Sequence, residues 1–160
     1  TATTVISGAY VAGNDAGRAF NTWPKMGDTW VPEGMWTITP IWRNLVENTA
    51  TVQFDHRMLA YTTFAVVWGN YLTALKGAHW SQLPKYTRRA FHATAGMSVA
   101  QVTLGVTAIL NYVPIEIAAA HQAGSLVLLT MVTGLAHSLR FSKVGRAATA
   151  ATAVVKAAVK

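Results

Sequence analysis

The sequence has no cysteine and few charged residues, which make up only 12% of its 160 positions. The lack of thiols excludes disulfides, thiolate nucleophiles, iron–sulfur clusters and Cys-ligated zinc. A soluble globular domain carries about twice this share of charge, so the chain has too little polar surface for a soluble fold. The formal net charge of +7 raises the question of nucleic-acid binding. Nucleic-acid-binding proteins also need a solvated surface, however, and we expect no nucleic-acid partner.

Long uncharged runs take the place of the missing polar surface. They cover residues 58–75, 90–110 and 117–139, and are 18, 21 and 23 residues long. Each is long enough to cross the ~30 Å hydrocarbon core of a bilayer as an α-helix. Residues 1–13 are uncharged but too short to span, and we expect them to be the end of a further helix. Because the sequence starts at Thr1 rather than at a methionine, we expect a processed product or a piece of a longer protein.

The predicted fold class is all-α, a polytopic transmembrane helix bundle with three complete spans and a partial first one. Residues 1–13 form the end of a transmembrane helix, and residues 14–48 form an outer surface loop. In this loop an apolar pattern at residues 41–47 predicts a short amphipathic helix lying on the membrane surface. The remaining predicted segments are transmembrane helices at 49–75, 90–112 and 115–140, a basic inner loop at 76–89 and an inner Ala/Lys-rich tail at 141–160.

The distribution of charge predicts the orientation of these spans. Nine of the 13 basic residues lie in two connections that hold no acid: Lys76, Lys85, Arg88, Arg89, Arg140, Lys143, Arg146, Lys156 and Lys160. Lys and Arg are retained on the cytoplasmic or matrix side of a membrane, so the inner loop and the C-terminal tail are predicted to lie there. The acidic outer loop then faces the periplasm or the intermembrane space. This rule applies equally to a mitochondrial inner membrane and to a bacterial one.

Four of the five histidines lie in or at the ends of spans, where an ionisable side chain suggests function. His56 and His121 are predicted at similar depth near the outer face. His92 and His137 lie near the inner face, where we expect snorkelling or a hydrogen bond to a neighbouring helix. His79 falls in the basic inner loop, where we expect a solvated side chain.

Three interpretations of the outer pair stay open on spacing alone: axial ligation of a haem iron, a hydrogen bond between helices, and a proton relay. Zinc is disfavoured because no third ligand is near. Small residues, among them Ala60 and Gly124, leave room for a flat macrocycle beside His56 and His121. Arg57, next in the chain to His56, could pair with a haem propionate.

Four blocks of sequence carry a resemblance to a known family. They are residues 8–17 (GAYVAGNDAG), 20–27 (FNTWPKMG), 44–61 (NLVENTATVQFDHRMLAY) and 112–126 (YVPIEIAAAHQAGSL). In this order they resemble the C-terminal half of haem A synthase, of the mitochondrial and alphaproteobacterial type. The similarity runs from about Thr4 to Arg140.

The resemblance implies a function for the intact protein and a cofactor for this part of it. Haem A synthases are oxidoreductases that convert the C8 methyl of haem O, their substrate, to the formyl of haem A for cytochrome c oxidase. In that family the histidines at the positions of His56 and His121 bind a b-type haem, through bis-histidine ligation of its iron. The catalytic residues are expected in the N-terminal half, so this chain alone should not complete the reaction. The alternative is a non-catalytic haem-binding or electron-transfer membrane subunit.

The resemblance also indicates surroundings and partners. A mitochondrial inner membrane is the expected location, with a bacterial inner membrane as the alternative. Expected partners are membrane lipid and the N-terminal half, supplied in cis or in trans. Haem O synthase, an electron donor and a second copy of the chain are further candidates.

Overall fold

The computed structural model describes residues 1–141, and this part of the chain is helical with no β-strand. Its α-helices are α1 (Ala2–Gly13), α2 (Asn44–Glu47), α3 (Thr49–Lys76), α4 (Lys85–Leu110) and α5 (Ile115–Phe141). Short 3₁₀ turns stand at η1 (Ala16–Arg18), η2 (Ile41–Arg43) and η3 (Trp80–Gln82). The predicted all-α class is therefore confirmed. The predicted Ala/Lys tail lies, from residue 142 on, outside the described residues.

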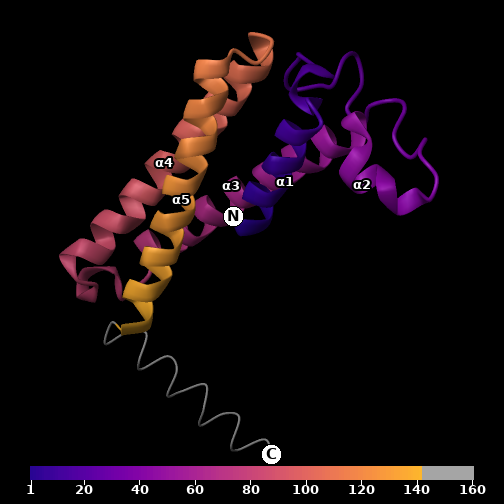
Figure 1. The fold of residues 1–160 in the computed structure, drawn as a ribbon. Coiled ribbons are helices and arrows are strands. Elements are labelled where there is room, and N and C mark those ends of the chain that lie inside the picture. Colours follow the sequence, from indigo (N-terminus) through magenta and orange to yellow (C-terminus); the bar gives the residue numbers. More distant parts are fainter. Residues whose placement is uncertain (142–160) are drawn as a thin grey trace, which may run out of the picture.

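α4 and α5 form an antiparallel hairpin and lie side by side for most of their length (Figure 1). They are the two described helices that are long and apolar enough to cross a membrane, each with a 26-residue candidate span that contains an 18-residue window of high mean hydropathy. Only 6% of the apolar window of α5 is buried within the protein, so most of its side chains face outward, as lipid-facing side chains do. α3 has 28 residues but falls short of the same hydropathy, and its span stays a prediction.

α1 and α3 pack against each other and cross the hairpin, so that α3 contacts α4 and α1 contacts α5 (Figure 1). The interior of this arrangement is made of small and polar side chains more than of large apolar ones. Ala95, Thr94, Ser98 and Gln101 of α4 are all buried. Small residues let helix backbones approach closely, which is the usual way in which helices associate inside a membrane.

Two buried asparagines hold the outer loop and start α3. The side chain of Asn48 accepts hydrogen bonds from the backbone amides of Ala50 and Thr51, at 3.0 and 3.1 Å, and so caps the helix. Its amide group donates to the carbonyl of Gly34 at 2.9 Å. Asn44, which is fully buried, bonds the backbone of residues 38 and 41. The loop is thus anchored at the point where α3 begins.

The outer loop also contacts the turn between α4 and α5. The side-chain amide of Asn21 donates to the carbonyl of Ile109, at 2.8 Å. Val113 lies in the left-handed region of the backbone, with a φ of 60°, and its side chain packs against Gly17, where a Cβ would lie 3.2 Å away. These contacts hold the loop over the end of the bundle that carries His56 and His121.

Candidate cofactor site between two histidines

The structure brings His56 of α3 and His121 of α5 together. Their ring centroids lie 6.4 Å apart, and the ring planes are nearly perpendicular, at 85°. The two residues are 65 positions apart in the sequence, so this approach comes from the crossing of the two helices. In the sequence, these two histidines were singled out because they are predicted at similar depth in their spans.

The spacing of the rings suits a single metal atom between them. An imidazole nitrogen binds a metal at about 2.0 Å, and the ring centre lies about 1 Å further out, so two imidazoles on opposite sides of one metal have centroids about 6 Å apart. The observed 6.4 Å is close to this value. Two nitrogens leave the other positions of a metal unfilled, and the four pyrrole nitrogens of a haem would complete such a set.

Each histidine rests against a glycine of a neighbouring helix. A Cβ on Gly8 of α1 would lie 3.1 Å from Cε1 of His56, and a Cβ on Gly105 of α4 would lie 3.1 Å from Cε1 of His121. Dispersion contacts between carbon atoms are best at about 3.5–4.0 Å, so any side chain at either glycine would push its histidine away. We call each of these glycine contacts a cradle, and the cradles of the two rings are alike in distance.

Ser7 of α1 bonds the ring of His56. Its hydroxyl lies 2.8 Å from Nδ1 of His56 and also donates to the carbonyl of Thr4 at 2.8 Å. A serine hydroxyl has one hydrogen, so when Ser7 donates it to Thr4, Nδ1 of His56 supplies the hydrogen in its bond with Ser7. Nε2 then keeps its lone pair, which is the arrangement that a metal-ligating histidine needs.

Several buried polar atoms around the pair have no hydrogen-bond partner among the described residues. They include both side-chain amide atoms of Gln101. Gln101 is 6% exposed and lies against Gly124, one turn beyond His121. Buried polar groups are costly unless they are paired, so this region is built to face a further polar group.

Arg57 lies beside the pair and anchors the outer loop. It is 8% exposed, and its guanidinium donates to the carbonyls of Phe20, at 3.0 Å, and Lys25, at 3.2 Å. Gln53, one turn earlier, donates to the carbonyls of Gly17 and Phe20, both at 3.2 Å. Nε of Arg57 is buried without a partner in the described part of the chain. A buried cation whose recorded partners are neutral carbonyls suits an anionic ligand.

The other histidines lie elsewhere. His92 shares a hydrogen bond of 2.7 Å with the hydroxyl of Tyr71, from α3, and so links two helices as one of its two interpretations expected. His79 is exposed just before η3. His137 is exposed near the end of α5. None of the three belongs to the outer pair.

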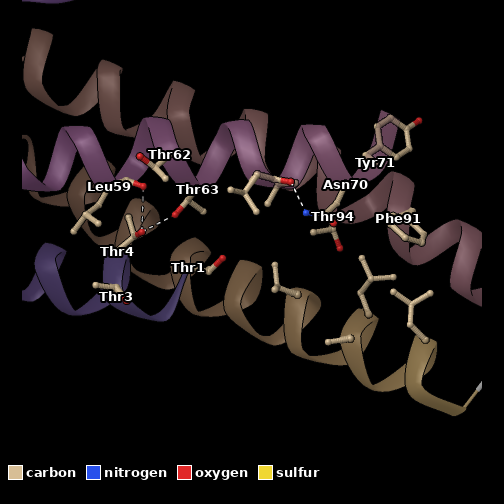
Figure 2. A pocket seen from close by; sticks show the side chains of 16 residues that line it. Thr1, Thr3, Thr4, Leu59, Thr62, Thr63, Asn70, Tyr71, Phe91 and Thr94 are labelled. Carbon is tan, nitrogen blue, oxygen red and sulfur yellow. Dashed lines mark hydrogen bonds between the residues drawn. The ribbon is translucent and has the colours of Figure 1, made fainter. Parts of the chain in front are cut away.

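A second cavity, of about 410 Å³, opens between α1, α3, α4 and α5, and neither histidine of the pair lines it. Its walls are mostly apolar side chains and threonines, with Asn70 and Tyr71 among them (Figure 2). The hydroxyl of Thr4 bonds the hydroxyl of Thr63 at 2.7 Å and the carbonyl of Leu59 at 3.4 Å. The cavity reaches Leu139 near the C-terminal end of α5, so it extends away from the pair toward that end of the helix.

Sequence reasoning missed the residues that support the two rings. Ser7, Gly8, Gln101 and Gly105 acquire their role only through contacts between helices. A glycine within a long helix was the available signal for such a contact. Glycine destabilises a helix, and one reason for its presence there is that a neighbouring group lies close to the backbone. Gly69, Gly96 and Gly134 also stand in helices, however, and a Cβ on any of them meets nothing within 4 Å.

Comparison with known proteins gives a consistent family. Residues 1–133 match the family described as “Cytochrome oxidase assembly protein”. The chain is 50% identical over 142 residues to “Heme A synthase COX15” of Arabidopsis thaliana, covering 86% of this chain and 29% of that protein. It is 43% identical to “Heme A synthase COX15” of Homo sapiens, with 86% and 32% covered. For “Heme A synthase” of Rhodospirillum centenum the identity is 45%, with 91% and 38% covered.

The chain spans about a third of the length of the curated relatives it matches, 29–38% for these three. No solved structure gives a significant match.

Proposed function

Because the chain belongs to the haem A synthase family, we propose that it is the part of such an enzyme that holds a b-type haem between His56 and His121. The intact enzyme converts haem O to haem A for cytochrome c oxidase. We place the oxidation of haem O in a part of the enzyme outside these 160 residues. The membrane is the mitochondrial inner membrane or its bacterial counterpart, with the outer loop in the intermembrane space or periplasm.

The observation that carries this proposal is the geometry of the two rings. Their separation of 6.4 Å leaves room for one metal atom between them. They come from different helices, and a glycine lies against each one. A hydrogen bond between helices was one of the open interpretations, and His56 makes one, from Nδ1 to the hydroxyl of Ser7 in α1. No hydrogen bond joins the two histidine rings to each other in the described structure.

Each nearby residue has a defined part in this site. His56 and His121 would bind the haem iron, and the hydroxyl of Ser7 would orient the His56 ring through its bond to Nδ1. Arg57 would neutralise a propionate while holding the outer loop over the haem edge. When bound, a bis-histidine haem supplies a one-electron redox centre whose potential depends on its ligands and their hydrogen bonds.

The test is an absorbance spectrum of the detergent-purified full chain, oxidised and dithionite-reduced, after addition of haem. We expect a six-coordinate low-spin b-type spectrum for the wild type. His56→Ala and His121→Ala should each lose it or become high-spin. His79→Ala is the matched control, because this histidine is exposed in the inner loop. A folded wild-type chain that stays colourless, or two variants that keep the low-spin spectrum, would refute the ligand pair.

A further inference from the structure

A separate pocket lies at the opposite end of the bundle from the outer loop. It has a volume of about 250 Å³ and is lined by Trp80, Lys85, Arg88, Arg89 and His92. Trp80 belongs to the 3₁₀ turn before α4, and the other four residues come from the first two turns of α4. The uncharged run of α4 begins at residue 90, so the pocket stands where this helix enters its apolar segment.

The pocket carries a concentration of positive charge without an acidic partner. Within residues 1–141 the two ion pairs are Arg18–Asp15 and Arg43–Glu47, both on the outer side of the bundle. The first turn of α4 has no acidic residue, and its N-cap, Pro84, makes no side-chain capping bond. The free amides of that turn add the positive end of the helix dipole. The positive charge of the three basic side chains and of the start of α4 therefore favours an anionic ligand in this pocket.

An aromatic wall stands behind the cations. The ring of Trp80 lies edge-on to His92, with centroids 5.6 Å apart, and 5.8 Å from Phe91. The hydroxyl of Tyr71 fixes His92 through a 2.7 Å hydrogen bond. Tryptophan and tyrosine at such a place are typical of the level of the lipid head groups. A ligand here would meet the rings of Trp80 and His92 as well as the three cations, because all five side chains line the pocket.

We propose that this pocket binds the phosphate head group of an anionic phospholipid. The three cations match the phosphate, and the aromatic wall matches the glycerol and the first methylenes of the acyl chains. A volume of 250 Å³ is below the roughly 300–1,000 Å³ of pockets that enclose a whole drug-sized ligand, so the pocket fits a head group and leaves the chains outside. Basic pockets on the inner side of membrane proteins bind such lipids. This proposal is independent of the haem site.

The test is native mass spectrometry of the full chain in detergent with added phosphatidylglycerol or phosphatidylcholine. We expect wild-type protein to retain phosphatidylglycerol preferentially. A basic residue near the head groups is worth about fivefold in affinity, so the double variant Arg88→Gln/Arg89→Gln should bind phosphatidylglycerol about 25-fold more weakly. Arg88→Lys/Arg89→Lys keeps the charge and should keep most of the affinity. Lys76→Gln removes a charge on the same side but outside the pocket, and serves as the control.

The outcomes separate lipid from other ligands. Equal retention of the two lipids by wild type would overturn the proposal, and so would a double Gln variant no weaker than Lys76→Gln. Displacement of the lipid by millimolar inorganic phosphate would indicate a site for free phosphate instead. Circular dichroism of each variant shows whether it is folded, and the Lys variant keeps the comparison valid if the Gln variant is not.

Discussion

Adding one methyl group at Gly105 should disturb the candidate site through His121 alone. The new Cβ would lie 3.1 Å from Cε1 and 3.4 Å from Nε2 of the ring. Carbon atoms prefer about 3.5–4.0 Å, so the ring must move by at least about 0.4 Å. Distances from a metal to its ligands hold to about 0.2 Å. The displacement therefore exceeds what the bond from His121 to a metal tolerates.

Two measurements should detect this displacement. In Gly105→Ala the overpacking should cost about 1–3 kcal/mol of stability, measured as a lower thermal midpoint by circular dichroism. The haem-loaded variant should also show a high-spin component in its absorbance and electron paramagnetic resonance spectra. Gly8→Ala should act in the same way through His56, because a Cβ at Gly8 would also lie 3.1 Å from Cε1 of its ring.

Gly96→Ala is the matched control, on the same helix and with nothing within 4 Å of the new Cβ. Because alanine favours helix over glycine by up to about 1 kcal/mol, this control should be neutral or slightly stabilising, with an unchanged spectrum. If Gly105→Ala and Gly96→Ala behave alike in both measurements, the cradle does not position the ring and our reasoning is refuted.

Three further changes test other parts of the structure. Ser7→Ala should weaken haem binding about 10- to 100-fold in a haem titration, because it removes the partner that orients a metal-ligating ring; the exposed Ser81→Ala should not. Asn48→Ala removes a helix cap and should lower stability in thermal unfolding by about 0.5–2 kcal/mol. The hydrogen bond from Arg43 lowers the pKa of Glu47 below its ordinary 4.5, so their pair should persist above pH 4.5 and be lost as pH falls through the lowered value. A carboxyl NMR titration of Glu47 that shows an ordinary midpoint would contradict the pair.

The helices of this chain could be predicted from its uncharged runs, because a long apolar segment has few other stable forms in a membrane. The pairing of His56 with His121 could also be predicted, because the depth of each histidine in its span follows from its distance to the end of that span in the sequence. The contacts of Arg57 could not be predicted. Its guanidinium donates to carbonyls of the outer loop. This arrangement depends on how residues 14–48 fold back, and the hydrophobic pattern of the sequence does not predict the path of an irregular loop. The sequence alone predicted a propionate partner, and the structure adds an anchoring role.

The support of the two rings repeats within the chain. A helix with a glycine precedes a helix with a histidine twice, as Gly8 with His56 and as Gly105 with His121. In both cases the glycine leaves just enough space for the histidine ring of the other helix. If both histidines bind one iron, as we propose, no position is left at that metal for an oxidant. Such a site would suit electron transfer or structural support, and the oxidation of haem O would then need a second site with an open position.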